Sequence, residues 1–509
     1  MITEDQAAVI EFLGASSTHG GVAVERIDTH SAIVFLAGDR AWKLKRAVRF
    51  DYLDFSTVTR RKALCEAEVR LNQRTAPAIY CGVVAITRGH DGALALGGSG
   101  EPVDWVVEMK RFDQDAVLDR LAASGRLGLD VMGDLARAIA RFHMAAAPRP
   151  DHGGKSGMEW VAEGNAAGFA EQGAGILDSA ACVRATNDTR LELDRRGALL
   201  DERREKGLVR QCHGDLHLRN IVLLDGQPTL FDAVEFNDEI ACTDVLYDLA
   251  FVLMDLWRRQ LPRHANTIWN GYLAETNDLE GIALMPLFLS CRAAVRAKTS
   301  ATAALVQSDA RQVSELEQLA REYLAMAERL LHPPSARVIA IGGLSGSGKS
   351  VLAMALAPSI GAVPGAVVIR SDEIRKRLCG VEPLQRLGPD GYTPEVSARV
   401  YATVEERAHL VVRNGHSAIV DAVHARPADR QAIERIAAAA AVPFTGIWLD
   451  APEEVLIARA TQRRLDPSDA DESVIRMQRA QDPGVIDWHR IDASSSQREI
   501  LRDALELFP

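Results

Sequence analysis

The sequence lacks any paired arrangement of cysteines. Its seven Cys are scattered along the chain, odd in number, and never spaced as Cys-x-x-Cys. They are residues 65, 81, 182, 212, 242, 291 and 379. A disulfide framework and a structural zinc site both depend on closely spaced ligands or on pairs. The pattern argues against both and indicates a protein whose thiols stay reduced.

Long apolar runs are also missing. No stretch approaches the roughly 18 uninterrupted apolar residues that predict a membrane-spanning helix. The run "IAAAAAVPF" (436–444) is short and Ala-rich, and it predicts a helix end that enters a strand. The N-terminal "MITEDQAAVIEF" is acidic and lacks the basic start and apolar run of a signal peptide. We therefore expect a cytoplasmic protein that does not contact a membrane.

Positively charged residues are outnumbered by negatively charged ones, and aromatic side chains are few. The net charge is −11, most of the excess lies before residue 336, and aromatic residues make up 5% of the chain. An acidic surface repels nucleic acid and favours cationic or neutral small molecules. The composition thus disfavours nucleic acid as a partner and favours a small acceptor, a cationic one included.

The chain divides where a helical pattern stops. The pattern over 313–332 ends at Pro333-Pro334, and the strand-like "RVIAIGG" begins at once. A double Pro after a helix is a good stop signal. A chain of 509 residues also exceeds one core, because domains usually hold ~100–200 residues. We place a domain boundary at about 334–336.

The part before this boundary divides again. Strand-like runs dominate up to about residue 110, with one helical run over 60–76, and helical patterns such as 129–147 dominate afterwards. This predicts an α+β unit of two lobes with a cleft between them. The last part alternates strands and helices, as in a parallel sheet. The predicted domains are a small sheet lobe (1–110), a helical lobe (111–334) and an α/β domain (335–509).

Two carboxylates and an amide surround a predicted hairpin in the helical lobe. "HGDLHLRN" places Asp215 five residues before Asn220, and Asp232 follows the apolar run of "PTLF". Asp225-Gly226 is a hairpin turn signal, so the second strand should return Asp232 to the side of Asn220. Phosphoryl transfer needs a base for the acceptor hydroxyl and ligands for Mg²⁺. The spacing therefore predicts one base and two metal ligands in one cleft.

"HGDLHLRN" followed by "FDAVEF" resembles the catalytic core of the aminoglycoside phosphotransferase and choline kinase superfamily, which has the protein-kinase-like fold. The resemblance implies that Asp215 is the catalytic base, that Asn220 and Asp232 bind the metal, and that His213 braces the loop. In that family an Asp of the following helix supports the loop. Two aspartates of "DVLYDLA" are candidates for it: Asp244 and Asp248.

The same resemblance implies a Lys–Glu pair in the small lobe. "AWKLKRAV" offers Lys43 and Lys45, which lie on one face if this is a strand, and the helical run offers Glu66 and Glu68. We prefer Lys43 and Glu68. A strand then joins the lobes, and the backbone of Glu108, Met109 and Lys110 in "WVVEMKRF" would meet adenine. The start of the unit holds no clear Gly-rich loop.

A second phosphate-binding motif begins the last domain. "GLSGSGKS" follows a predicted strand, precedes a predicted helix, and fits the P-loop pattern G-x-x-x-x-G-K-S. Its glycines let backbone N–H groups wrap phosphates, while its Lys reaches the β/γ-phosphates and its Ser binds Mg²⁺. The predicted nucleotide-binding residues are Gly343, Gly346, Gly348, Lys349 and Ser350.

The strands after this motif resemble those of small P-loop kinases related to phage polynucleotide kinase, gluconate kinase and zeta toxin. "AVVIRSDEIRKRL" and "SAIVDAVHARPADR" each end a strand with an Asp. The resemblance implies that Asp372 is the base, that Arg375 contacts acceptor or phosphate, and that Asp421 lies on the metal side. An Arg-rich helical lid follows. Its candidates for neutralising the phosphoryl group are Arg459, Arg463 and Arg464. "DPSDAD" (466–471) could act there or cap the next helix.

The order of the two units resembles bacterial proteins described as bifunctional aminoglycoside phosphotransferase/ATP-binding proteins. We therefore expect two ATP- and Mg²⁺-dependent kinase sites. The first would phosphorylate a hydroxyl of an amino sugar, an aminoglycoside or a sugar, and the P-loop unit a second small molecule. Two alternatives stay open for the P-loop unit: a polynucleotide 5′-hydroxyl kinase, or a nucleotide switch without its own substrate.

Overall fold

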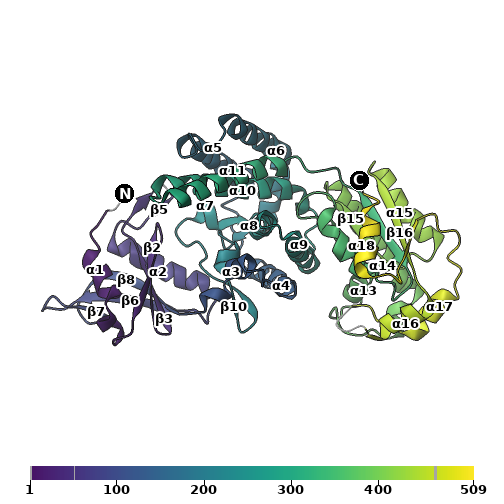
Figure 1. Ribbon diagram of the computed structural model, residues 1–509, viewed down its shortest axis with the longest axis horizontal. Coiled ribbons are helices and arrows are strands. Elements are labelled where there is room, and N and C mark those ends of the chain that lie inside the picture. The colour runs from purple at the N-terminus through teal and green to yellow at the C-terminus, as the bar shows by residue number, and fades with distance from the viewer. Residues whose placement is uncertain (1–2, 51, 463–466, 509) are drawn as a thin grey trace. The chain divides into compact units, whose positions relative to one another are not determined.

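A computed structural model describes residues 3–50, 52–462 and 467–508. The chain forms two compact units (Figure 1). One comprises the residues up to 161 together with 193–255, and the other comprises 162–192 together with the residues from 256 onward. The bounds of the three predicted domains stay a prediction.

An antiparallel sheet begins the first unit. In the described part of the chain it has six strands in the order β1-β2-β3-β8-β6-β7. Their bounds are β1 (Val24–Asp28), β2 (Ala32–Ala37), β3 (Arg40–Lys45), β8 (Glu101–Lys110), β6 (Tyr80–Arg88) and β7 (Leu94–Leu96).

Alternation along β2 builds a core on each face of this sheet. Ile33 and Phe35 pack with helix α1 (Ala7–Gly14), whereas Val34 and Leu36 pack with helix α2 (Val58–Asn72). Side chains of a strand alternate between the two faces of a sheet. Since Val34 pairs with Lys43 in β3, both Lys43 and Lys45 lie on the α2 face.

The rest of the first unit is mainly helical and holds the predicted hairpin. Strands β10 (Ile221–Leu224) and β11 (Gln227–Leu230) pair antiparallel, with Asp225 and Gly226 both at positive φ in the turn. This confirms the hairpin. Neighbouring elements are α3 (Leu118–Ala123), α4 (Asp130–Ala145), α7 (Asp238–Ala241), α8 (Val245–Arg258) and the paired strands β9 (Val209–Gln211) and β12 (Cys242–Asp244). Helices α5 (Gly154–Glu171) and α6 (Ser179–Glu205) belong in part to each unit.

A parallel sheet is the centre of the second unit. Over the described residues it has five strands in the order β14-β15-β13-β16-β17. Their bounds are β14 (Val367–Arg370), β15 (Ala418–Asp421), β13 (Val338–Gly343), β16 (Phe444–Asp450) and β17 (His489–Asp492). The helices around it are α12 (Lys349–Leu356), α13 (Ser371–Leu378), α14 (Pro394–Arg413), α15 (Pro427–Ala439), α16 (Glu453–Gln462), α17 (Glu472–Arg479) and α18 (Gln497–Leu505). As predicted, an α+β unit with an antiparallel sheet precedes an α/β domain with a parallel sheet.

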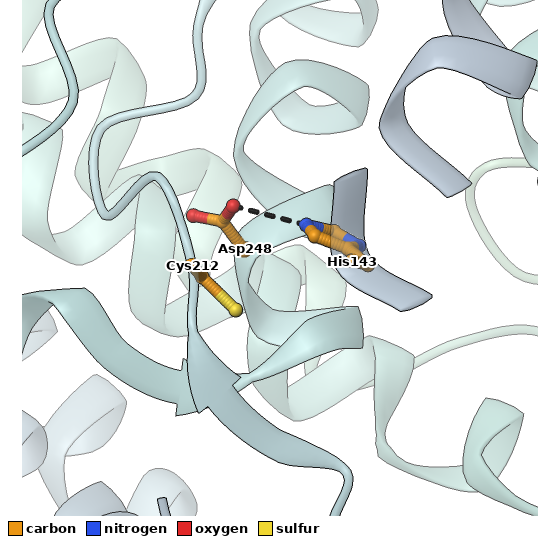
Figure 2. Close-up of side chains that lie close together, drawn as sticks. All are labelled: His143, Cys212 and Asp248. Atoms are coloured by element: carbon orange, nitrogen blue, oxygen red, sulfur yellow. Dashed lines mark hydrogen bonds and ion pairs between the residues drawn. The ribbon is translucent and has the colours of Figure 1, made fainter. Parts of the chain in front are cut away.

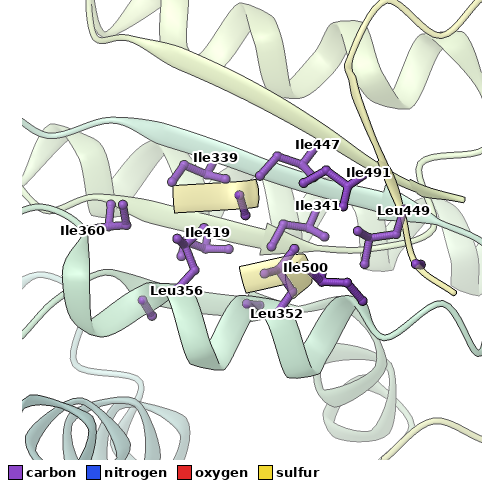
Figure 3. Packing of buried hydrophobic residues seen from close by; sticks show 14 of the residues in the cluster. Ile339, Ile341, Leu352, Leu356, Ile360, Ile419, Ile447, Leu449, Ile491 and Ile500 are labelled. Atoms are coloured by element: carbon purple, nitrogen blue, oxygen red, sulfur yellow. The ribbon is translucent and has the colours of Figure 1, made fainter. Parts of the chain in front are cut away.

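One face of the parallel sheet packs on α12 and α18. Ile339 and Ile341 of β13 are fully buried against Leu352, Leu356 and Ile500 (Figure 3). Because β13 ends in the P-loop and α12 begins at Lys349, this core fixes both sides of the nucleotide-binding turn.

Helix α9 (Pro262–Thr276) covers the open edge of the parallel sheet. The Asn266 amide donates to the carbonyls of Pro364 (3.0 Å) and Ala366 (3.2 Å), and the Asn270 side-chain oxygen accepts from Val368 N–H (2.7 Å). A sheet edge leaves backbone groups that must find partners. The two asparagines supply them along β14, the strand that leads to Asp372.

Two long helices, α10 (Met285–Val306) and α11 (Ala310–Leu330), pack together in the second unit. Helix α11 corresponds to the predicted helix over 313–332 and ends just before the double Pro. None of the helices within the described ranges is long and apolar enough to cross a membrane.

Replacing Ile341 with Ala is expected to lower the free energy of unfolding by about 2–5 kcal/mol, because it leaves a cavity under the P-loop strand. Denaturant titration followed by circular dichroism measures this. Val351→Ala is the control, since its side chain is 49% exposed on α12, and it should change stability by less than about 0.5 kcal/mol. Equal effects of the two variants would contradict the packing.

Candidate active sites

The loop after β9 holds the first predicted carboxylate in a polar turn. The side-chain amide of Asn220 donates to the backbone oxygen of Asp215 (2.9 Å) and to its Oδ2 (3.0 Å). His217 Nε2 lies 3.3 Å from the same Oδ2, and the Asp215 side chain is 41% exposed. The carboxylate is therefore oriented by two neighbours and still open to a ligand.

His213 is buried behind this loop. Its Nε2 lies 2.9 Å from the carbonyl oxygen of Phe231, at the end of the hairpin. Burial lowers the pKa of His213, which favours the neutral ring. Gly214 has φ +83°, and a Cβ there would press against Val234. The His-Gly pair thus ties the loop to the segment that carries Asp232.

Asp248 of α8 holds the start of the loop from beneath. Its Oδ2 accepts from His213 N–H (3.1 Å) and its Oδ1 from Gly214 N–H (2.9 Å). Asp244 contacts a different group, the buried guanidinium of Arg203, at 2.7 and 2.9 Å. Of the two aspartates that the sequence left open, Asp248 is the one that contacts the loop of residues 213–220.

His143 and Cys212 complete a buried cluster around Asp248 (Figure 2). His143 Nε2 lies 3.1 Å from Asp248 Oδ2, and burial raises the pKa of the Cys212 thiol well above its usual value. The three side chains include metal-ligand types, but both Asp248 oxygens already accept backbone N–H groups. The cluster therefore braces the loop.

Asp232 lies in a turn that L-residues rarely adopt. Its φ is +63°, its N–H donates to the Tyr80 hydroxyl (3.1 Å), and the next N–H, of Ala233, donates to Asn72 Oδ1 (2.8 Å). The Asp232 side chain is 42% exposed, and its Oδ1 lies 2.6 Å from Lys43 Nζ. The small lobe thus holds the backbone on both sides of Asp232.

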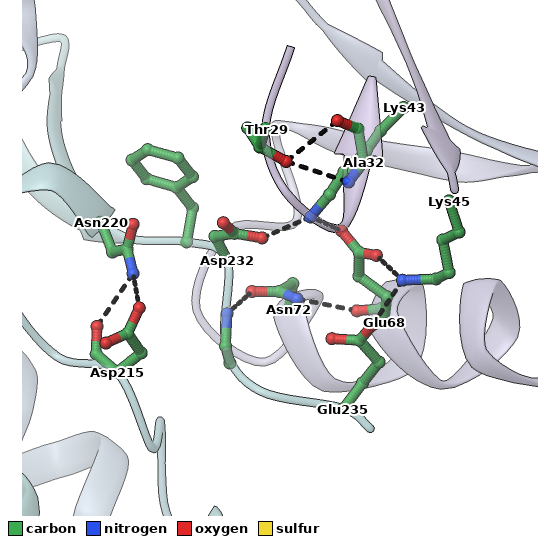
Figure 4. Close-up of polar contacts among 12 residues, drawn as sticks. Thr29, Ala32, Lys43, Lys45, Glu68, Asn72, Asp215, Asn220, Asp232 and Glu235 are labelled. Atoms are coloured by element: carbon green, nitrogen blue, oxygen red, sulfur yellow. Dashed lines mark hydrogen bonds and ion pairs between the residues drawn. The ribbon is translucent and has the colours of Figure 1, made fainter. Parts of the chain in front are cut away.

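A buried carboxylate joins the two candidate lysines (Figure 4). Glu68 of α2 accepts from Lys43 Nζ at Oε1 (2.8 Å) and from Lys45 Nζ at Oε2 (2.5 Å). Lys45 also pairs with Glu235. Glu66 instead faces outward with a side chain that is 52% exposed. Both lysines and Glu68 therefore belong to one network.

Burial and charge compete within this network. Burial alone would raise the pKa of Glu68, but Lys43 and Lys45 outweigh it and lower this pKa to about 2. Burial would lower the pKa of each lysine, but the surrounding carboxylates raise both. A depressed carboxyl pKa stabilises the fold above pH ~4.5, and this contribution is lost as pH falls toward 2. The network is thus charged at neutral pH.

The predicted adenine-contacting residues lie inside the sheet. Glu108 and Met109 of β8 pair with β3 on one side and β6 on the other, and Glu108 forms a 3.1 Å ion pair with Arg40. The chain leaves the sheet only after Lys110. At the other end of the lobe, the β1–β2 turn closes without glycine, through a bond from Ala32 N–H to Thr29 Oγ1 (2.9 Å).

The P-loop joins β13 to α12 in the second unit. Gly343, Gly346 and Gly348 all have positive φ, and a Cβ at Gly346 would meet the Leu456 carbonyl. Lys349 Nζ donates to the Leu344 carbonyl (3.0 Å), which closes the loop. The turn can thus present backbone N–H groups to phosphate.

Two strand ends place charged groups beside the P-loop. Ser350 Oγ donates to Asp421 Oδ2 (2.5 Å), and Arg370 Nε lies 3.4 Å from the same oxygen. Burial raises the pKa of Asp421. Asp372 is the second residue of α13, which begins directly after β14, and it is half-buried. Ligands of parallel sheets bind at the carboxyl ends of strands, where these residues lie.

Arg370 was not identified from the sequence. Its signal is a charged residue at the end of the apolar strand "AVVIR", next to Ser371-Asp372. In the first unit, Asn72, Glu235 and His143 were missed as well. Nothing in the local sequence pattern of these three residues indicates their partners.

The remaining predicted arginines differ in their surroundings. Arg375 is buried, with Nη1 donating to Gly391 O (2.8 Å) and Ser397 Oγ (3.2 Å) and its guanidinium over the Tyr392 ring. Arg459 Nη1 donates to Ala493 O (2.6 Å). Arg463 and Arg464 lie outside the described residues.

The two described aspartates of the 466–471 segment have different partners. Asp471 caps α17 by accepting from Ser473 and Val474 N–H. Asp469 instead accepts from the buried Lys376 Nζ (2.5 Å) and from the Tyr392 hydroxyl (2.8 Å). The helix-capping interpretation of this segment therefore holds for Asp471.

Models of two protein families match the chain, one before and one after the double Pro. A model of the phosphotransferase enzyme family matches residues 36–284, and a model of an AAA domain matches residues 338–482. An uncharacterized protein of Mycobacterium tuberculosis is 30% identical over 494 residues, which cover 94% of each chain. An adenylyl-sulfate kinase of Myxococcus xanthus is 31% identical over 123 residues, which are 24% of this chain and 62% of that enzyme.

Parts of the chain also resemble two solved kinase structures. The amicoumacin kinase hAmiN, in complex with AMP-PNP, Ca²⁺ and Ami, matches with TM-score 0.40 and 12% identity, over 64% of this chain and 94% of that one. A Mycobacterium tuberculosis APS kinase with AMPPNP and APS matches with TM-score 0.25 and 24% identity, over 34% of this chain and 98% of that one.

The two family-model matches define a phosphotransferase with an alcohol group as acceptor, built from two kinase-like domains. The chain belongs to the family of this mycobacterial relative, with which it aligns over both domains.

Replacing Asp248 with Asn should loosen the catalytic loop. Asn has one side-chain oxygen, so it cannot accept from both His213 and Gly214 N–H as Asp248 does at two oxygens. Hydrogen exchange followed by mass spectrometry should show faster exchange in a peptide covering 209–224. Asp238→Asn is the control, because its side chain is 53% exposed. Unchanged exchange in the Asp248 variant would contradict the bracing.

Proposed function

We propose that the first unit transfers the γ-phosphoryl group of ATP to a hydroxyl of a small polar molecule. The observation that carries the proposal is that five side chains from separate elements lie close together (Figure 4). They are Lys43, Glu68, Asp215, Asn220 and Asp232. This is the set of charges that positions nucleotide phosphates, metal and acceptor in kinases.

Each side chain then has a defined task. Asp215 is half exposed and oriented by Asn220, so it can accept the proton of an acceptor hydroxyl. Asn220 and Asp232 would hold Mg²⁺, which neutralises charge on the transferring phosphoryl group. Their oxygen atoms suit this hard cation. Lys43, oriented by Glu68, would bind the α- and β-phosphates.

The proposed acceptor is an amino sugar, an aminoglycoside or a sugar. The acidic charge of the chain supports a cationic or neutral molecule, because it attracts cations and repels polyanions. Backbone groups just beyond β8, rather than those paired inside it at Glu108 and Met109, are proposed to contact adenine.

For the P-loop unit we propose a second small-molecule kinase. Asp372 would accept the proton of its acceptor hydroxyl, and Ser350 and Asp421 would hold Mg²⁺. Arg370, close to Asp421, is the proposed cation for the transferring group. Arg375 is proposed to hold the wall of the acceptor site, because its guanidinium binds the 391–397 segment. Similarity to an adenylyl-sulfate kinase supports a small acceptor.

Transfer from γ-labelled ATP with Mg²⁺ tests both sites. The acceptors are a panel of amino sugars, sugars, aminoglycosides and 5′-hydroxyl oligonucleotides. Asp215→Ala should reduce small-molecule labelling by about 10²–10⁴-fold, because the base is lost. Asp225→Asn, in the hairpin turn, is the control and should label like wild type. Oligonucleotide labelling lost only in Lys349→Ala would overturn the proposal and favour polynucleotide kinase activity.

The same assay separates a second kinase from a nucleotide switch. Lys349→Ala disables the P-loop in either case, whereas Asp372→Ala removes only the proposed base. A second labelled product should be lost in both variants. If Asp372→Ala retains all labelling that Lys349→Ala loses, the P-loop unit is a switch.

A further inference from the structure

The segment from Phe231 to Phe236 has to hold Asp232 in an unfavourable turn. With φ at +63°, this residue has a left-handed backbone that a non-glycine residue rarely adopts. Such a conformation persists where surrounding contacts enforce it, and it is often found at functional sites. The contacts of this segment therefore show what keeps Asp232 in place.

Backbone bonds attach the segment to both lobes of the unit. On the small-lobe side, Asp232 N–H donates to the Tyr80 hydroxyl and Ala233 N–H to Asn72 Oδ1. On the catalytic-loop side, Val234 N–H donates to the His213 carbonyl (2.9 Å). These bonds fix the backbone, but they do not pair the carboxylates of Asp232 and Glu235.

Two ion pairs supply those partners. Asp232 pairs with Lys43, and Glu235, three residues later, pairs with Lys45. The second pair is dry: the Lys45 side chain is 1% exposed and that of Glu235 is 5% exposed. Glu68 accepts from both lysines and thereby links the two ion pairs (Figure 4). The result is one continuous chain of contacts in the order Asp232, Lys43, Glu68, Lys45 and Glu235.

Under the proposed function, nucleotide binding would break the link between Lys43 and Asp232. Lys43 contacts Asp232 directly, yet both are needed by other partners when phosphate and metal bind. Lys45 has no such duty, because its Nζ is enclosed by Glu68, Glu235 and the Phe55 ring. When Lys43 turns to phosphate, the Lys45–Glu235 pair still holds the segment, and Lys45 still holds Glu68.

We propose that Lys45 and Glu235 are positioning residues for phosphoryl transfer: they keep Asp232 ready for Mg²⁺ and Glu68 directed at Lys43 while Lys43 exchanges partners. The inference rests on the proposed function of the first unit. It assigns a task to the second lysine of "AWKLKRAV" and to a glutamate that the sequence motif does not include.

The test is nucleotide binding by the full chain in a Lys349→Ala background, which suppresses binding at the P-loop. Isothermal titration with AMP-PNP, with Mg²⁺ and with EDTA, measures how much the metal strengthens binding. Lys45→Met should lower this Mg²⁺-dependent gain by about 10–100-fold, the usual effect of removing a residue that orients a metal ligand. Affinity for metal-free AMP-PNP should fall by a smaller factor, because Lys43 still has Glu68 as a partner.

Two further variants separate positioning from stability. Glu235→Gln is nearly isosteric and should lose the gain in the same direction even if Lys45→Met folds poorly. Arg61→Met removes an equally buried ion pair of α2, where Arg61 Nε lies 2.8 Å from Asp104 Oδ1. It should lower thermal stability and keep the Mg²⁺-dependent gain, since this pair does not contact Asp232 or Glu68.

The outcomes are distinguishable. If Asp232→Asn abolishes the gain and Lys45→Met and Glu235→Gln retain it, the positioning role is wrong and the proposed function stands. If Arg61→Met loses the gain as Lys45→Met does, the effect is structural and the inference fails. If Asp232→Asn itself retains the gain, the proposed metal ligand is wrong, and the proposed function fails with it.

Discussion

The carboxylate of Glu68 is the interaction on which the first site depends. It is fully buried, and each of its oxygens binds a different lysine. A buried charge is tolerated only when it is paired and hydrogen-bonded. Two strand lysines can satisfy one carboxylate because residues two apart on a strand face the same way. The position of α2 against β3 is thus linked to the charge balance of the cleft.

This constraint reaches the catalytic loop through a short segment. Asp232 binds Lys43 and Glu235 binds Lys45, at the two ends of the chain of contacts that runs through Glu68. The backbone between the two carboxylates is hydrogen-bonded to Asn72 and His213. Asp248 holds the other end of the loop through backbone N–H groups. Charged pairs on one side and backbone bonds on the other therefore locate Asp215 and Asp232 relative to each other.

The P-loop site also contains a buried carboxylate that is paired with polar neighbours, but in a different fold. Asp421 is buried at a strand end, where its Oδ2 accepts from the Ser350 hydroxyl and lies beside the Arg370 guanidinium. Here the parallel sheet provides the order, because its strands end together at one edge. The asparagines of α9 bind the outer strand of that sheet, so the element that presents Asp372 is supported from both sides.

The elements of the fold and of the candidate sites were predictable where one short stretch of sequence determines the geometry. The hairpin after Asn220 and the P-loop strand and helix follow from local turn and periodicity signals. The choice between Asp244 and Asp248 did not, because it depends on which side of α8 faces the loop and where Arg203 lies. Glu235 and Arg370 were missed since their partners, Lys45 and Asp421, are distant in sequence and meet them only in the folded chain.

The most direct test of the proposed first site is the position of the metal and of Lys43 in a nucleotide complex. We would determine the structure of the chain with AMP-PNP and Mn²⁺ and locate the metal by anomalous scattering. The account predicts a metal peak bound by Asp232 and Asn220, with Lys43 moved to a phosphate oxygen and still bonded to Glu68, and with Lys45 unmoved between Glu68 and Glu235. A first unit in which the metal binds away from Asp232, or in which Lys43 stays paired with Asp232, would contradict it.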